Sequence, residues 1–296
     1  MVDKPRTVLV IGKTGQLARE LARSPWPAGW QASFAGRDAI DLACPDAAAA
    51  CVEAAAPEMV VNAAAYTAVD KAESEPGLAD AVNAVAPGAI AAACARMNVP
   101  FVTVSTDYVF DGAKRGAYVE SDPVGPIGAY GRSKERGERL VREAHGRHLI
   151  LRTSWVFGAL GNNFVRTMLR LGAERKTLKV VADQRGKPTA AADLAAGVIA
   201  AAAGLAGDAS LAGTYHLANE GPTSWHEFAR AIFDGAKTRG AAVPDEVLPI
   251  ATAEYPTPAR RPMNSELDCE LFARRFGLRQ RDWRLALKDV LDELLT

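Results

Sequence analysis

The sequence has few cysteines and no net charge, and each absence excludes a class of protein. Its four cysteines are scattered, with no Cys-x-x-Cys pair and no histidine clustered beside them: Cys44, Cys51, Cys94 and Cys269. This arrangement argues against a zinc site and a disulfide framework, and it predicts ordinary thiols in a reducing cytoplasm. Lysine plus arginine and aspartate plus glutamate number 35 each in 296 residues. No overall charge therefore points to nucleic acid or an anionic membrane as a partner.

The sequence also lacks a long apolar run. The first run, Val8 to Ile11, is too short for the core of a secretory signal and ends at a glycine. The alanine-rich stretch at 195–206 is shorter than the roughly 20 residues that span a bilayer. We therefore expect this stretch to be a helix packed on a sheet, and we expect no membrane partner.

What is present is a regular alternation of strand-like and helix-like segments. Helical patterns, the longest at about 75–97, separate strand-like runs at 7–11, 31–35, 59–65, 101–104 and 148–153. This alternation predicts an α/β fold with a Rossmann-like doubly wound parallel sheet in residues 1–153. Beyond Ser154 the pattern loosens, which predicts a smaller C-terminal lobe at 154–296. We expect the two to interleave, the chain returning to the sheet at about 165–206 through a strand at 178–181 and a helix near 193–203.

A glycine turn follows the first strand and opens a helix. Its pattern is Gly-x-x-Gly-x-x-Ala and includes Gly12, Gly15 and Gln16. Glycines there let the backbone approach a pyrophosphate, and the helix N-terminus favours its charge, so the turn predicts a dinucleotide site. The pattern is neither Gly-x-Gly-x-x-Gly nor a Walker loop, and a tight turn without a ligand is the alternative. Arg37, after the second strand, favours the 2′-phosphate of NADPH; an exposed loop arginine is the alternative there.

The candidate catalytic groups follow the strand at 101–104. Thr106 comes at the end of this strand, and Tyr130 and Lys134 are four residues apart, which places both on one face of a helix. A phenol with a pKa of about 10 is a weak acid near neutrality, and we expect the nearby ammonium to lower that pKa. A Tyr-x-x-x-Lys pair alone is weak evidence, because an exposed helix face contains it just as readily.

Two later segments carry side chains suited to a sugar, a base or a phosphate. The loop after Ser154 contains Trp155 and Asn163, whose aromatic and amide groups can cover a sugar or a base. The proline-rich arm at 255–262 contains Arg260 and Arg261, and arginine suits phosphate oxygens. A solvated basic loop is the alternative interpretation of the arm.

These segments together resemble the dTDP-4-dehydrorhamnose reductases, a family of extended short-chain dehydrogenase/reductases. The matching segments are 12–16, 61–73, 105–110, 152–156 and 255–262, and the resemblance extends over nearly the whole chain. It implies reduction of the C4 keto group of dTDP-4-dehydro-β-L-rhamnose to dTDP-L-rhamnose, with NADPH as the cofactor and NADH as the alternative. This is the last step of dTDP-L-rhamnose biosynthesis, which serves lipopolysaccharide or cell-wall polysaccharide.

The resemblance also implies a role for each matching residue. The catalytic set is Thr106, Tyr130 and Lys134. The cofactor-binding residues are Gly12, Gly15, Gln16, Leu17, Arg37, Asp41, Leu42, Ala65, Tyr66, Thr67, Tyr130 and Lys134. The substrate-binding residues are Thr106, Asp107, Tyr108, Trp155 and Asn163, to which we add Arg260, with Arg261 as the alternative, for the diphosphate.

The chain departs from the family pattern at two places. Many members have histidine where this chain has Tyr66, in the cofactor site. Some members hold Mg²⁺ between subunits through glutamates, and Glu20 and Glu293 fit that pattern, but the third position is Ala192. We therefore expect no bound metal and a monomer or weak homodimer.

Two rival functions use the same fold. One is a non-catalytic NADP-binding regulatory subunit, resembling the β subunit of methionine adenosyltransferase. The other is a different nucleotide-sugar enzyme, such as another reductase, a dehydratase or an epimerase. Against the second, dehydratases and epimerases typically carry Asp-Glu or similar residues after the catalytic threonine, where this chain has Asp107-Tyr108.

Overall fold

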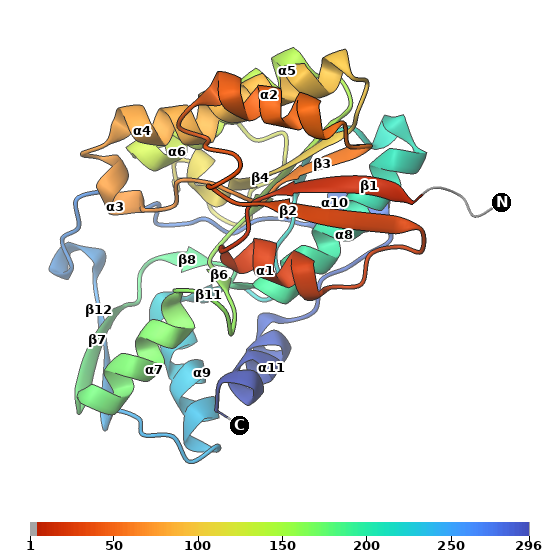
Figure 1. Ribbon diagram of the computed structural model, residues 1–296. Coiled ribbons are helices and arrows are strands. Elements are labelled where there is room, and N and C mark those ends of the chain that lie inside the picture. The colour runs from red at the N-terminus through yellow and green to blue at the C-terminus, as the bar shows by residue number, and fades with distance from the viewer. Residues whose placement is uncertain (1–4, 296) are drawn as a thin grey trace.

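A parallel sheet of six strands forms the centre of the computed structural model, which describes residues 5–295. The strands lie in the order β2, β1, β3, β4, β5, β10, and the first four are labelled in Figure 1. Their bounds are β1 Arg6–Ile11, β2 Trp30–Ala35, β3 Met59–Asn62, β4 Phe101–Thr106, β5 His148–Thr153 and β10 Gly213–His216. The chain moves outward from β1 in both directions, with the change of direction between β1 and β3. The predicted doubly wound α/β fold is therefore confirmed.

Helices cover both faces of the sheet, so its strands are apolar on both sides. One face carries α1 (Gln16–Arg23) and α8 (Ala191–Gly207); the other carries α2 (Pro45–Ala55), α5 (Ala86–Arg96) and α6 (Ala129–Ala144) (Figure 1). Neighbouring residues of one strand alternate between the two cores: Val61 packs in the first and Val60 in the second. All four residues of β3 are buried, which explains its apolar sequence.

The helical stretch Pro76–Arg96 matches the helix expected at 75–97. It consists of α4 (Pro76–Asp80), a π-helical turn at Ala81–Val85, and α5. By length and apolar composition it could cross a membrane, but half of its most apolar window is buried inside the fold. There α5 packs on α2 and α6, as the core helix of a folded domain does.

The second lobe has an apolar core of its own, below the sheet in Figure 1. It is built from α7 (Phe164–Glu174), α9 (Trp225–Lys237) and α11 (Trp283–Leu295). Beside them, β7 (Thr177–Val181) pairs with β12 (Glu246–Ile250) in a separate two-stranded sheet. The predicted return to the main sheet through 178–181 is therefore wrong. The helix α8 does return there, and β10, not β7, follows it into the sheet.

Short elements complete the lobe. β6 (Val156–Phe157) pairs with β9 (Thr189–Ala190), and β8 (Arg185–Gly186) pairs with β11 (Thr223–Ser224). Ser224 and Glu227 form a capping box at the start of α9. The remaining elements are α3 Val69–Ala72, α10 Glu270–Phe276 and the 3₁₀ turns Asp107–Val109, Ala209–Leu211 and Thr252–Glu254. A domain boundary at residue 153 stays a prediction.

Candidate active site

The carboxyl ends of the central strands open into two adjoining hollows, where ligands of doubly wound sheets bind. The first has a volume of about 490 Å³ and the second of about 560 Å³, and they share Gly12, Arg37 and Thr67. Predicted residues that line the first are Gly12, Gly15, Gln16, Leu17, Arg37, Ala65, Thr67, Thr106, Asp107, Tyr108, Tyr130, Lys134 and Trp155. Those that line the second also include Asp41, Leu42 and Tyr66. We call the first hollow the cleft and the second the adenine-side hollow.

The glycine turn has the geometry that a pyrophosphate requires. Gly12 has a φ of +121°, and a Cβ at this position would lie 3.4 Å from the backbone of Ala63, so a side chain there would be strained and crowded. Gly15 is the N-cap of α1 and has no side chain to cap the helix. The first N–H groups of α1 therefore face the cleft without a side-chain partner. These residues fit a dinucleotide phosphate.

Asn83 shapes the adenine-side hollow from the π-helical turn. Its Oδ1 accepts a hydrogen bond from Tyr66 N at 2.8 Å, and its Nδ2 donates to Tyr66 O at 2.9 Å. The Tyr66 hydroxyl donates to Glu75 at 2.8 Å. Tyr66 therefore lies in a fixed position where many relatives were expected to have histidine.

The predicted catalytic pair, Tyr130 and Lys134, is carried by α6, which lies unusually close to the 3₁₀ turn after β4. A Cβ on Gly131 would come within 2.2 Å of the carbonyl oxygen of Tyr108, so only glycine permits this approach. Glu73 fixes the start of the helix, because its Oε1 accepts a hydrogen bond from Ala129 N at 2.7 Å. Tyr130, one residue later, packs edge-on against the ring of Tyr108, with centroids 5.6 Å apart.

The ionisation of the pair differs from our expectation. Burial raises the pKa of Tyr130 to about 12, and the Thr106 hydroxyl offsets this only in part. Burial also reduces the pKa of Lys134 itself to about 8, although the charge of Glu138 opposes that change. Tyr130 is therefore a protonated phenol at neutral pH, which is the state of a proton donor.

A buried ion pair lies behind Lys134. Glu138, on the next turn of α6, accepts a hydrogen bond from Ser105 Oγ at 2.6 Å and from Arg152 Nη2 at 2.7 Å. All three side chains are at most 5% exposed. Because a buried charge is stable only when it is paired, this network fixes α6 against β4 and β5.

Two buried oxygens at the cleft have no hydrogen-bond partner within residues 5–295. They are Asp107 Oδ2 and Thr153 Oγ1, and both residues line the cleft. Burial also raises the pKa of Asp107 to about 7. Unpaired polar atoms in a folded interior are costly, so their position at a cleft favours a polar ligand that satisfies them.

Two predicted substrate residues lie outside the cleft lining. Asn163 is the N-cap of α7, and its Nδ2 donates to Gln16 Oε1 at 3.0 Å; it supports a residue that is predicted to bind the cofactor. Arg260 is exposed, and its side chain makes no hydrogen bond or ion pair in the part of the chain that the structure describes. The neighbouring Arg261 forms two hydrogen bonds to Asp70, at 2.5 and 2.8 Å, so it is not free to bind phosphate.

The residues at the position of the relatives' Mg²⁺ do not fit a metal. Arg23 lies between the two glutamates, with Nε 2.5 Å from Glu20 and Nη1 2.6 Å from Glu293. The guanidinium already occupies the space between the two carboxylates and pairs with both, and the third position is Ala192. The ion pair between Arg23 and Glu293 instead links α1 to α11.

The sequence-based predictions missed several cleft residues, among them Lys13, Thr153 and Trp225. The Lys13 side chain packs against Gly36, the residue before Arg37. Thr153 is the last residue of β5, and Trp225 is the first residue of α9. Lys13 and Thr153 were visible as residues at the ends of predicted strands. For Trp225, nothing in the local sequence indicated that α9 starts at the cleft.

Comparison with known proteins places the chain in a family. The family model described as RmlD substrate binding domain matches residues 6–296. The dTDP-4-dehydrorhamnose reductase of Burkholderia thailandensis is 48% identical over 98% of this chain and 99% of its own length. That of Escherichia coli (strain K12) is 41% identical over 98% of each. This chain belongs to the dTDP-4-dehydrorhamnose reductase family.

Solved structures agree with the family assignment. The dTDP-4-dehydrorhamnose reductase of Bacillus anthracis, crystallised in complex with NADP, has a TM-score of 0.90 and 36% identity, covering 98% of this chain and 99% of that one. A UDP-glucose 4-epimerase from Thermus thermophilus is also similar, with a TM-score of 0.79, but at 19% identity it shows the fold alone.

Proposed function

We propose that this chain reduces the C4 keto group of dTDP-4-dehydro-β-L-rhamnose to dTDP-L-rhamnose with NADPH. The observation that carries the proposal is the meeting of Tyr130, Thr106 and the Gly12–Gly15 turn at one cleft. Relatives 48% and 41% identical over nearly their whole length bear the name of this enzyme, and the B. anthracis relative binds NADP.

The glycine turn and Arg37 would hold the cofactor phosphates, and Asp41, Leu42, Ala65, Tyr66 and Thr67 its adenosine half. When bound, the dihydronicotinamide supplies the hydride for C4. Arg37, with Lys13 beside it, favours the additional phosphate of NADPH over NADH.

Tyr130 acts as the general acid. Its hydroxyl donates the proton to the oxygen at C4 as that oxygen becomes an alkoxide. The Thr106 hydroxyl donates a hydrogen bond to the same oxygen and keeps the carbonyl in line with the phenol. Lys134, buried behind them, supplies a positive charge that stabilises the tyrosinate left after the transfer.

The substrate would lie on the other side of the cleft. Asp107 Oδ2 and Thr153 Oγ1, which lack hydrogen-bond partners among the described residues, can bind sugar hydroxyls, while Tyr108 and Trp155 contact the sugar ring. We keep Arg260 for the diphosphate, because its guanidinium is exposed and unpaired within residues 5–295. Asn163 contributes indirectly, through Gln16.

The two rivals predict different solution behaviour. A regulatory subunit does not need the complete set Thr106, Tyr130 and Lys134, and an epimerase returns its hydride to the substrate. The test is the absorbance of NADPH with enzymatically made dTDP-4-dehydrorhamnose. We expect stoichiometric oxidation of free NADPH over many turnovers. No oxidation, together with a stoichiometric partner in a pull-down, would favour the regulatory subunit.

A monomer or weak homodimer in the cytoplasm stays a prediction. Light scattering on the purified chain tests the oligomeric state.

A further inference from the structure

Trp155 has a backbone conformation that is rare for its residue type. Its φ is +47°, in the left-handed region. Its indole lies against Gly186, where an added Cβ would come within 2.5 Å of the ring. The ring also stacks on Trp225, with centroids 3.6 Å apart and an angle of 9° between the planes. Both tryptophans line the cleft.

Two short ladders bring these residues together from distant parts of the sequence. β8 and β11 pair so that Gly186 lies opposite Thr223, and the capping box then starts α9 at Trp225. β6 and β9 pair directly after Trp155, whose carbonyl oxygen accepts a hydrogen bond from Thr189 N at 3.2 Å. Backbone pairing therefore sets the main-chain position of all three residues, and the contacts between their side chains set the orientation of the indole.

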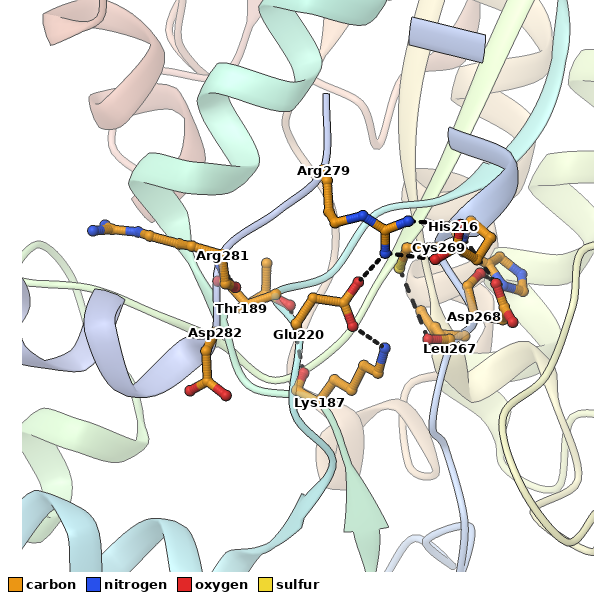
Figure 2. Close-up of polar contacts among 12 residues, drawn as sticks. Lys187, Thr189, His216, Glu220, Leu267, Asp268, Cys269, Arg279, Arg281 and Asp282 are labelled. Atoms are coloured by element: carbon orange, nitrogen blue, oxygen red, sulfur yellow. Dashed lines mark hydrogen bonds and ion pairs between the residues drawn. The ribbon is translucent and has the colours of Figure 1, made fainter. Parts of the chain in front are cut away.

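Lys187 fixes the segment that carries Gly186. Its carbonyl oxygen accepts a hydrogen bond from Ser154 Oγ at 2.6 Å, directly before Trp155. Its ammonium lies 3.2 Å from Glu220, which also binds Arg279, as Figure 2 shows. Because the Lys187 side chain is only 9% exposed, this ion pair holds the segment in one place.

We propose that Gly186 and Trp225 are positioning residues for Trp155. They hold its indole in one orientation as the apolar wall against which the sugar nucleotide lies. This inference rests on the proposed function, in which Trp155 contacts the substrate. A methyl group at residue 186 displaces the ring, and loss of the indole at 225 frees it to rotate. Both changes weaken substrate binding and leave the cofactor residues untouched.

Gly186→Ala and Trp225→Ala test the inference through separate KM values. We expect the KM for the dTDP-sugar to rise on the order of tenfold, the scale of one lost aromatic pair, while kcat and the KM for NADPH stay close to wild type. Trp225→Phe retains a ring and should recover most of the wild-type KM. A second readout does not depend on turnover: stacked indoles couple their transitions, so Trp225→Ala should remove a couplet from the circular dichroism spectrum.

Trp30→Phe is the matched control, because Trp26 and Trp30 also stack, at 6.2 Å, and neither lines the cleft. This variant should change the spectrum and leave both KM values at wild type. If Trp225→Ala binds the dTDP-sugar as well as an active wild type does, the inference is overturned and the proposed function stands. If the wild type does not reduce the dTDP-sugar, both are overturned. Should Gly186→Ala fail to fold, the two Trp225 variants decide.

Discussion

Lys134 Nζ donates a hydrogen bond of 2.7 Å to the carbonyl oxygen of Val104, on the strand that ends in Thr106. The ammonium is thereby bound to β4 and not to the phenol one turn earlier on α6. It is only 5% exposed, and burial disfavours its charged form. Its pKa of about 8 lies well below that of a free lysine.

We expect kcat/KM to fall as the pH rises through about 8. The sign follows because the lysine serves the site in its protonated form: activity is full below the pKa and is lost above it. kcat/KM is the suitable quantity, since it reports ionisations of the free enzyme. Lys134→Arg keeps its charge over this range, so its profile, even at low activity, should lack the alkaline limb. An unchanged limb would assign the ionisation to another group.

Gly131→Ala should move α6 away from β4. The new Cβ would meet the Tyr108 carbonyl oxygen at 2.2 Å, so the helix that carries Tyr130 has to shift. A displacement of about 1 Å costs on the order of 10²-fold in rate, and we expect a loss of that size in kcat. Gly77→Ala is the control, because a Cβ there meets nothing within 4 Å; it should keep wild-type kcat. Equal kcat in the two variants would contradict the close-approach argument.

Arg37→Ala should reduce the preference for NADPH over NADH. The lost guanidinium would face the 2′-phosphate, whereas NADH has only a hydroxyl there. The ratio of kcat/KM for the two cofactors measures this, and we expect it to fall on the order of tenfold or more. Arg274→Ala, at an exposed position of α10, controls for the loss of a surface charge. A wild type that already prefers NADH would overturn this role for Arg37.

Substitutions of the two arginines of the 255–262 arm should have different effects, one on stability and the other on substrate binding. Arg261 holds the arm on Asp70 through two hydrogen bonds, so Arg261→Ala should reduce the free energy of unfolding by about 1 kcal/mol. Arg260→Ala should leave stability unchanged and raise the KM for the dTDP-sugar. An unchanged KM in Arg260→Ala would remove this residue from the diphosphate site.

The main sheet was predictable because its strands carry their own evidence. The runs that end at Ile11, Thr106 and Thr153 are largely apolar and are bounded by turn residues, and both features are visible in the local sequence. The structure buries these strands on both faces. The sheet that a strand joins is harder to predict than the strand itself, because strand pairing depends on segments that are distant in the sequence. The strand at 178–181 exists, but its partner is Glu246–Ile250, and nothing within either segment specifies that pairing.

The site divides in the same way. The residues at strand ends and on α6 could be predicted, because parallel strands deliver their carboxyl ends to one edge. The ionisation of Tyr130 could not, since it depends on burial by the whole fold. Nor could the pairing of Arg23 with Glu20 and Glu293, which joins the two ends of the chain.

The most direct test of the account is the turnover of Tyr130→Phe with NADPH and dTDP-4-dehydrorhamnose. Removing the only atom that donates the proton should lower kcat by about 10²- to 10⁴-fold, with NADPH binding and the melting temperature unchanged. Turnover close to that of the wild type would contradict the assignment of Tyr130 as the proton donor.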